Sequence, residues 1–215
     1  MRTVFFDDIN SFEHLDLILG TKSIGKAEPK YLSVEIEGGD GELDYTDYFG
    51  DIHYKNRPLS FAFSILGDKN DFLRRYSEIQ NLLNGRKMKI TLSEDRDWYY
   101  VGRVTVNDWQ SKKNIGEIVI DVNAEPYKLR HALTVVAVPK LNSVSWVTVN
   151  CKNCRMPTIA TISADGGYTL KVGDNAAKEY SGDAEITLTE GDNVLMLRAS
   201  SVGVNVKISY REGSL

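Results

Sequence analysis

The chain contains two cysteines, Cys151 and Cys154, whose spacing is typical of metal and redox sites. A C-x-x-C pair supplies half of a four-ligand zinc site, or forms a dithiol whose first thiolate is stabilised at a helix N-terminus. The sequence has no second C-x-x-C and no closely spaced pair of histidines, and the cysteines follow a β-like run, Ser145 to Asn150. The pattern therefore favours a turn with two small side chains over zinc binding or redox chemistry.

Carboxylates recur between positions 40 and 51 at a density that suggests a calcium-binding loop. The residues concerned are Asp40, Glu42, Asp44 and Asp47. An EF-hand loop that began at Asp40 would place Tyr45 where glycine is needed and Asp51 where glutamate closes the shell. We therefore interpret the segment as a solvated acidic loop, which can still contact a basic patch on a partner.

Three histidines, His14, His53 and His131, are scattered along the chain without a neighbouring nucleophile. The sequence also lacks a G-x-S-x-G elbow and a G-x-x-x-x-G-K-[ST] phosphate loop. We nominate no catalytic, cofactor-binding or metal-binding residue. The sequence therefore predicts a protein that is not an enzyme and that needs no cofactor.

Five aromatic residues could stack on sugar rings, as aromatic residues do in carbohydrate-binding modules. They are Trp98, Tyr99, Tyr100, Trp109 and Trp146. An aromatic residue that alternates along a strand usually packs against a neighbour on the next strand, so packing is the favoured interpretation. A carbohydrate-binding module or lectin-like envelope or adhesion protein is the alternative function.

Length, composition and charge exclude several classes of protein. The 215 residues are enough for one large or two small domains, and 42% hydrophobic with 26% charged residues excludes general disorder. A formal charge of −4 argues against a protein that mainly neutralises nucleic-acid phosphates. No apolar run reaches the ~20 residues of a membrane-spanning helix, and the N-terminus does not resemble a signal peptide. We therefore expect neither a membrane span nor export by that route.

Hydrophobic residues alternate with a period of two over most of the chain, which predicts a mainly β protein. The first predicted strands are Tyr31 to Ile36, Leu59 to Ile65, Met88 to Leu92, Tyr99 to Val106, Ile115 to Val122 and Leu133 to Val138. Shorter strands follow at Val144 to Val149, Thr158 to Ile162, Tyr168 to Val172, Glu185 to Thr189, Asn193 to Arg198 and Asn205 to Tyr210. Such spacing suits β-sandwiches or barrels.

One segment has helical spacing instead. Between Asp71 and Asn84 the apolar residues form a single stripe, which predicts one α-helix. Asp68 or Asn70 can cap its first N–H groups, and Gly85 stands where a left-handed residue would end it. We expect this helix to cover one open sheet face.

The composition changes near residues 130 to 140, where aromatic residues become fewer and Ser, Thr, Val, Gly and Asn more frequent. We therefore predict an N-terminal domain at residues 1–132 and a small C-terminal β-sandwich at residues 133–215. Before His131 the chain has 18 basic and 22 acidic residues, so all of its net negative charge lies in the first part.

The acidic loop, read with its neighbours, resembles a known family. The run Gly38-Gly39-Asp40-Gly41-Glu42-Leu43-Asp44-Tyr45-Thr46 is similar to the G-x-D-G-x-L-D-x-T loop of siphophage distal tail proteins, also called Dit. The resemblance continues, in order, through Tyr54 to Phe61, Ile79 to Arg86, Tyr99 to Val104 and Ala124 to Lys128. It covers about the first 130 residues, and the rest is matched only by its β character.

The resemblance implies a structural role. In that family the N-terminal domain is a tail-tube-like β-sandwich with one helix, and the C-terminal domain is similar to a galectin or carbohydrate-binding module. Six copies form a ring at the tail tip or baseplate hub of a phage or prophage particle. The ring connects the tail tube protein to the tail-associated lysin, tail fibre or receptor-binding protein. It leaves a channel for DNA without binding nucleic acid specifically.

Such a role sets further expectations for this chain. It would be made in the bacterial host cytoplasm and located in the virion tail tip, and carboxylates on the channel wall would repel passing DNA. We predict that two loops contribute to the ring interface, Thr21 to Lys30 and Asp40 to Asp51, because long polar loops often carry contacts. The interface candidates are Gly25, Pro29, Asp40, Asp44, Asp47 and Asp51.

Overall fold

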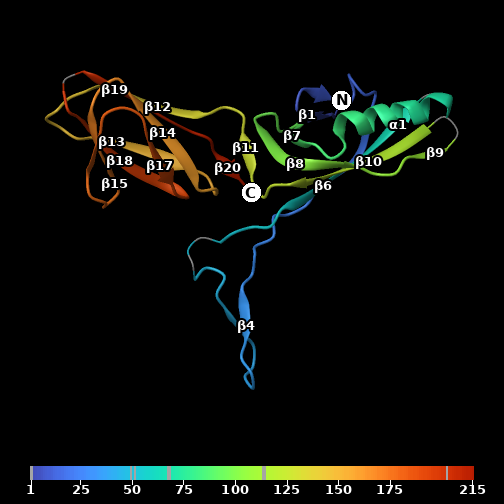
Figure 1. Ribbon diagram of the computed structural model, residues 1–215, viewed down its shortest axis with the longest axis horizontal. Helices are drawn as coiled ribbons and strands as arrows, with labels where there is room; N and C mark the ends of the chain where they lie inside the picture. Colours follow the sequence, from blue (N-terminus) through green and yellow to red (C-terminus); the bar gives the residue numbers. More distant parts are fainter. Residues whose placement is uncertain (1, 49, 51, 67–68, 113–114, 202) are drawn as a thin grey trace. The chain divides into compact units, whose positions relative to one another are not determined.

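The structure is a computed structural model that describes residues 2–48, 50, 52–66, 69–112, 115–201 and 203–215. It divides into two compact units, Met1–Lys128 (unit 1) and Leu129–Leu215 (unit 2). Both are built mainly of antiparallel strands, and the described residues include one helix (Figure 1). The predicted mainly β fold with one helix is therefore confirmed.

Unit 1 is built on a single curved arrangement of paired strands, in the order β2-β1-β7-β8-β10-β6-β3, with β9 beside β10. The elements are β1 (Val4–Phe6), β2 (Ile9–Asn10), β3 (Ile18–Ile24), β4 (Ser33–Glu35), β5 (Glu42–Asp44), β6 (Arg57–Leu66), α1 (Lys69–Leu83), β7 (Lys87–Leu92), β8 (Trp98–Val106), β9 (Gln110–Lys112) and β10 (Ile115–Ala124). Within the described ranges, strands β4 and β5 pair only with each other.

The core of unit 1 lies between one face of this sheet and the helix. Strands β6 and β10 pair in register from Arg57 opposite Ala124 to Leu66 opposite Ile115, and alternate residues along both strands are buried. Helix α1 contributes buried side chains to the same core, among them Phe72 and Ile79. The period of two in the sequence and the one helical stripe therefore mark opposite sides of one core.

The helix ends where the sequence predicts. Gly85 has a φ of 76°, a left-handed conformation that glycine adopts without strain, and its N–H donates to the Val104 carbonyl at 2.8 Å. The helix begins at Lys69, so Asn70 lies inside it and is not the flanking cap; Asp68 lies outside the described residues. The predicted loop from Thr21 is also wrong at its start, because β3 pairs with β6 as far as Ile24.

Unit 2 is a sandwich of two four-stranded sheets, β12-β19-β14-β17 and β13-β18-β15-β16, and buried residues from both sheets fill its core. The elements are β11 (Lys128–Arg130), β12 (Thr134–Leu141), β13 (Val147–Asn153), β14 (Thr158–Ala164), β15 (Tyr168–Val172), β16 (Lys178–Tyr180), β17 (Ala184–Leu188), β18 (Gly191–Ala199), β19 (Val204–Tyr210) and β20 (Gly213–Ser214). Within the described residues, no helix is long and apolar enough to span a bilayer.

Close packing between neighbouring strands of unit 1 provides a test of the fold. A Cβ atom at Gly102 would lie 2.5 Å from a methyl group of Val122 and 2.7 Å from the Cα of Ala124. Because the backbone of β10 cannot move away without disturbing its ladder, we expect Gly102→Ala to lower the free energy of unfolding by about 1–3 kcal/mol. Thermal or denaturant unfolding measures the change.

Gly20 is the matched control, because it is also a strand glycine and a Cβ there would meet only the Ala62 carbonyl oxygen at 3.4 Å. We expect Gly20→Ala to change stability by less than about 1 kcal/mol. Equal effects of the two substitutions would contradict the strand packing described for β8 and β10.

Candidate assembly surface

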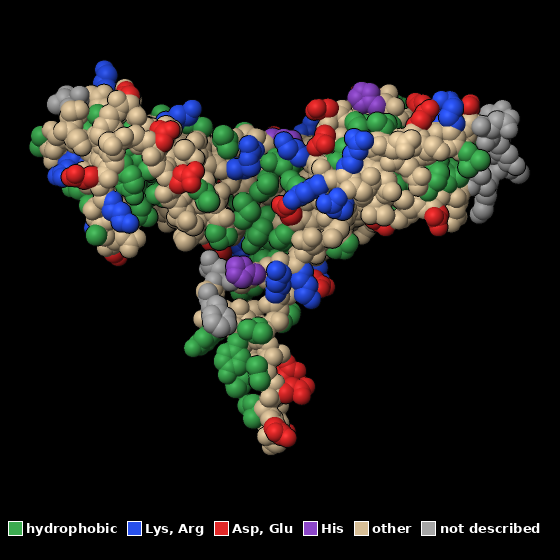
Figure 2. Space-filling view, in the orientation of Figure 1, with side chains coloured by type: hydrophobic (Ala, Val, Ile, Leu, Met, Phe, Trp, Pro, Cys, Tyr) green, Lys and Arg blue, Asp and Glu red, His purple; other side chains and the backbone are tan. Residues whose placement is uncertain are grey.

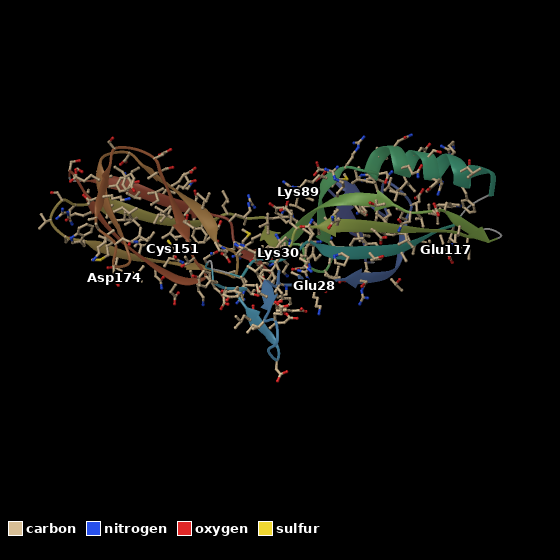
Figure 3. The ribbon with its side chains drawn as sticks, turned by 60° about the horizontal axis from the view of Figure 1, so that its bottom comes forward. Glu28, Lys30, Lys89, Glu117, Cys151 and Asp174 are labelled. Atoms are coloured by element: carbon tan, nitrogen blue, oxygen red, sulfur yellow. The ribbon has the colours of Figure 1, made fainter. Side chains whose placement is uncertain are left out.

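Residues 29 to 54 form a hairpin that leaves the body of unit 1, and we call this segment the arm. Its base is fixed by backbone hydrogen bonds: the Lys30 N–H donates to the His53 carbonyl at 2.8 Å, and the Lys55 N–H donates to the Glu28 carbonyl at 2.7 Å. Glu28 and Lys30 are labelled in Figure 3. An isolated bridge joins Pro29 to Tyr54 at the same level. Beyond this base every described residue from Tyr31 to Asp44 is exposed.

The arm has one apolar face. Val34 on β4 lies directly opposite Leu43 on β5, and Leu32 and Ile36 share that face because side chains alternate along a strand. The four side chains are between 46% and 52% exposed, although residues of this type are normally buried. Contiguous exposed apolar surface of this kind marks an interaction site.

The opposite face of the arm is acidic. Glu35 lies directly opposite Glu42, and Asp44 lies opposite Ser33. Figure 2 shows the two characters on separate sides of the arm, with hydrophobic side chains on one side and carboxylates on the other. Like charges opposed across a ladder repel, and no cation pairs with Glu35 or Glu42 in the part of the chain that the structure describes.

The arm contains the acidic excess of unit 1. Seven of the 22 acidic residues of the unit lie in the arm but only one of its 17 basic residues, so the rest of unit 1 carries a charge of +1. The negative balance of the N-terminal part suits a DNA channel whose wall repels phosphates. The count instead assigns it to a thin hairpin, so the net charge is no evidence about what lines a channel.

A turn after β5 fixes the end of the acidic face. Asp44 accepts hydrogen bonds from the backbone N–H and the hydroxyl of Thr46, and the Thr46 hydroxyl oxygen accepts from the Leu32 N–H at 3.1 Å. These bonds to the charged carboxylate lower the pKa of Asp44 below its ordinary value. Asp44 is therefore held as an anion at the surface of the arm.

The predicted interface residues divide into two groups. Pro29, Asp40, Asp44 and Asp47 all belong to the arm. Gly25 does not: its N–H donates to the Pro58 carbonyl, its carbonyl accepts from the Arg57 Nε, and a Cβ there would lie 2.7 Å from Pro58. Gly25 therefore packs within unit 1. Asp51 lies outside the described residues.

The sequence interpretation missed β5 and the apolar face. The sequence predicts a polar loop over residues 40 to 51, whereas Glu42–Asp44 is a strand paired with β4. The signal was present, because Leu43 alternates with acids beyond a glycine-rich turn, as Val34 does before it. The predicted strand Tyr31 to Ile36 is shorter in the structure, Ser33–Glu35.

The other residues with chemical potential lie in packed positions. Cys151 is fully buried in β13, so the predicted turn is wrong at this residue; Cys154 follows the strand and its thiol lies 3.3 Å from Glu212 Oε2. Burial raises the pKa of both thiols, which is the opposite of an activated thiolate. Among the described residues, no three His, Cys, Asp or Glu side chains form a group that could hold a metal.

The tryptophans proposed for sugar stacking have protein neighbours. The centroids of the Trp109 and Phe72 rings lie 5.4 Å apart. Lys128 lies over the Trp98 ring, and Arg198 lies over the Trp146 ring. A more open aromatic position occurs in unit 2, at a cleft of about 500 Å³ bordered by the edge strands β16 and β17. Tyr180 lines this cleft, and its ring stacks on the buried Tyr168 ring at 5.6 Å.

The comparisons with known proteins bear on the fold. The crystal structure of the Dit (gp 19.1) protein of phage SPP1 matches this chain with a TM-score of 0.71, 15% sequence identity and coverage of 100% of both chains. This chain has the Dit fold. The predicted resemblance to distal tail proteins is confirmed at the level of the fold, over unit 2 as well as unit 1. A designed double-stranded β-helix matches 37% of the chain at a TM-score of 0.27. No family model and no curated protein sequence matches.

The carboxylate turn of the arm gives a direct prediction. Thr46→Val removes the hydroxyl that donates to Asp44, so we expect the pKa of Asp44 to rise toward its ordinary value. An NMR titration of the side-chain carboxyl carbon measures it. Ser33→Ala is the control, because Ser33 lies opposite Asp44 in the ladder without a hydrogen bond to it, and this change should leave the pKa of Asp44 unaltered. An unmoved titration in Thr46→Val would contradict the described turn.

Proposed function

We propose that this chain is a non-enzymatic structural protein of a phage or prophage tail. Six copies form a ring at the tail tip, which connects the tail tube to tail-associated and receptor-binding proteins and leaves a channel for DNA. The Dit fold over the whole chain supports the proposal, because SPP1 Dit is described as a paradigm of the adsorption-apparatus hub in phages that infect Gram-positive bacteria. The ordered sequence motifs support it independently.

The observation that carries the proposal is the apolar face of the arm. Four aliphatic side chains are about half exposed on a hairpin whose two strands form a separate two-stranded sheet. Completing the burial of each one would stabilise a complex by roughly 1 kcal/mol. A protein whose role was confined to one copy would gain nothing from this exposure, whereas a subunit of an assembly would.

The occupant of this face is a second copy of the chain. The arm carries a charge of −6 from its sequence and the rest of unit 1 carries +1, so an arm is attracted to the body of another copy more than to another arm. An arm that binds the body of the next copy makes a head-to-tail contact, and such contacts form a ring when the rotation between neighbouring copies closes. The ring number of six comes from the family resemblance.

The proposed assembly depends on the apolar face. We expect the double variant Val34→Ser, Leu43→Ser to weaken self-association by roughly 2 kcal/mol, about thirtyfold, because both side chains leave the interface. Multi-angle light scattering and sedimentation over a concentration series give the mass, and electron microscopy gives the ring number.

Ile159→Ser is the matched control, since Ile159 is 62% exposed in unit 2 and lies outside the arm. We expect this variant to assemble as the wild type does. A wild-type protein that stays monomeric at high concentration, or forms a closed ring of another number, would overturn the hexamer; assembly that survives loss of both apolar residues would overturn the role of the arm.

A second candidate function is saccharide binding by unit 2, and the cleft beside β16 and β17 favours it. Its lining combines the Tyr180 ring and apolar side chains such as Ile186 with polar groups such as Lys178, Glu185 and Asn175. An aromatic face beside hydrogen-bonding groups matches the apolar face and hydroxyls of a pyranose ring.

The cleft is tested on a glycan array followed by NMR titration with any sugar that binds. We expect Tyr180→Ala to abolish binding and Tyr180→Phe to retain most of it, because the ring face makes the contact. Trp146→Ala is the control and should leave binding unchanged, since Arg198 covers that ring. No binding to any sugar, or equal loss in the control, would rule out this candidate.

A further inference from the structure

A pair of like charges of the opposite sign lies on the body of unit 1. Lys87 on β7 is directly opposite Arg103 on β8, and both side chains are exposed on the sheet face that points away from the core. Lys89, two residues farther along β7, belongs to the same face (Figure 3). Two cations opposed across a ladder repel each other, as the carboxylates of Glu35 and Glu42 do, and the salt bridge from Lys87 to Glu125 offsets part of this repulsion.

The cationic pair borders a shallow polar depression of about 350 Å³. Its lining consists of Asn56, Lys87, Gly102, Arg103, Thr105, Asn123 and Glu125. Lys87 pairs with Glu125 at 2.6 Å between Nζ and Oε1, and Arg103 donates to the Gly85 carbonyl. Glu125 therefore neutralises one of the two cations, and the depression with Lys89 keeps a positive balance that suits a carboxylate ligand.

We propose that the Glu35–Glu42 pair of one arm binds the Lys87–Arg103 pair of a second copy. The inference rests on the proposed function, and it adds the acceptor surface to it. Both pairs are directly opposed residues of antiparallel ladders, so their Cβ atoms have the same spacing of about 4.5–5.5 Å. Because the two carboxylates are spaced like the two cations, each carboxylate can meet one cation. The contact then reduces the repulsion between the two carboxylates and between the two cations.

The reach of the arm explains why the acceptor belongs to another copy. Asn56 lines the depression and stands two residues beyond Tyr54, so the base of the arm lies close to its own cationic pair. Glu35 is six residues from Pro29, which at about 3.3 Å per residue carries the acidic pair about 20 Å away. An extended arm therefore cannot return to its own depression, and each copy donates one arm and accepts another.

Reciprocal charge reversal tests this contact. One variant carries Glu35→Lys and Glu42→Lys on the arm; the other carries Lys87→Glu and Arg103→Glu on the body. In each variant alone, the arm and the body carry charges of the same sign at every arm-to-body contact. We therefore expect self-association at least about tenfold weaker than that of the wild type. In an equimolar mixture every arm meets a complementary body when the two variants alternate, so assembly should recover. An alternating ring closes for an even number of copies, which six satisfies.

The controls separate folding and the proposed function from the inference. Circular dichroism and thermal unfolding check that each variant is folded, and Lys87→Gln with Arg103→Gln serves as a milder body variant that should also weaken assembly. Lys152→Glu with Lys207→Glu in unit 2 should have no effect. Wild-type assembly by both reversed variants, or a mixture that fails to recover, would overturn the acceptor assignment while leaving the ring intact. A monomeric wild type would instead overturn the proposed function.

Discussion

The central constraint on this molecule is an amphipathic hairpin that the described part of its own chain leaves exposed. In the rest of unit 1, aliphatic residues of β6 and β10 meet the helix or another strand, and their burial supplies the hydrophobic stabilisation of the fold. Val34 and Leu43 have the same alternation, but among the described residues no second layer buries them. Burial of these side chains can therefore release free energy only when another molecule covers the arm. The chemistry of the arm then determines which other surfaces of unit 1 can serve as its partner.

The sequence predicted most of the body because its signals are local and redundant. Alternation along Leu59 to Ile65 marks a strand with one buried face, and the stripe from Phe72 to Leu83 with Gly85 behind it marks a helix and its end. The arm shows the limit of such signals. Leu43 alternates with acids just as a core strand does, and a periodicity cannot state whether a second layer covers the apolar side.

The sequence predicted where the candidate surface lies but not that it has an apolar face. The acidic residues near Asp44 are recognisable from the sequence as charges. The structure shows that Leu43, between two of those acids, lies on the opposite face of the hairpin. The Lys87–Arg103 pair could not be found from sequence, because the two residues become neighbours only through the register of β7 and β8. Glycine positions such as Gly25 likewise show their role only when the neighbouring chain is in place.

The acidic face also restricts what the arm can bind. A free hairpin presents unpaired strand edges, and an apolar edge strand readily pairs with another copy of itself. With seven carboxylates and one lysine in the segment, two arms brought edge to edge would repel each other strongly. Repulsion between arms therefore opposes arm-to-arm pairing, while the apolar face and the cationic body favour the head-to-tail contact. The two faces of the hairpin thus perform different tasks: one supplies the driving force for assembly, and the other selects the partner surface on which the force acts.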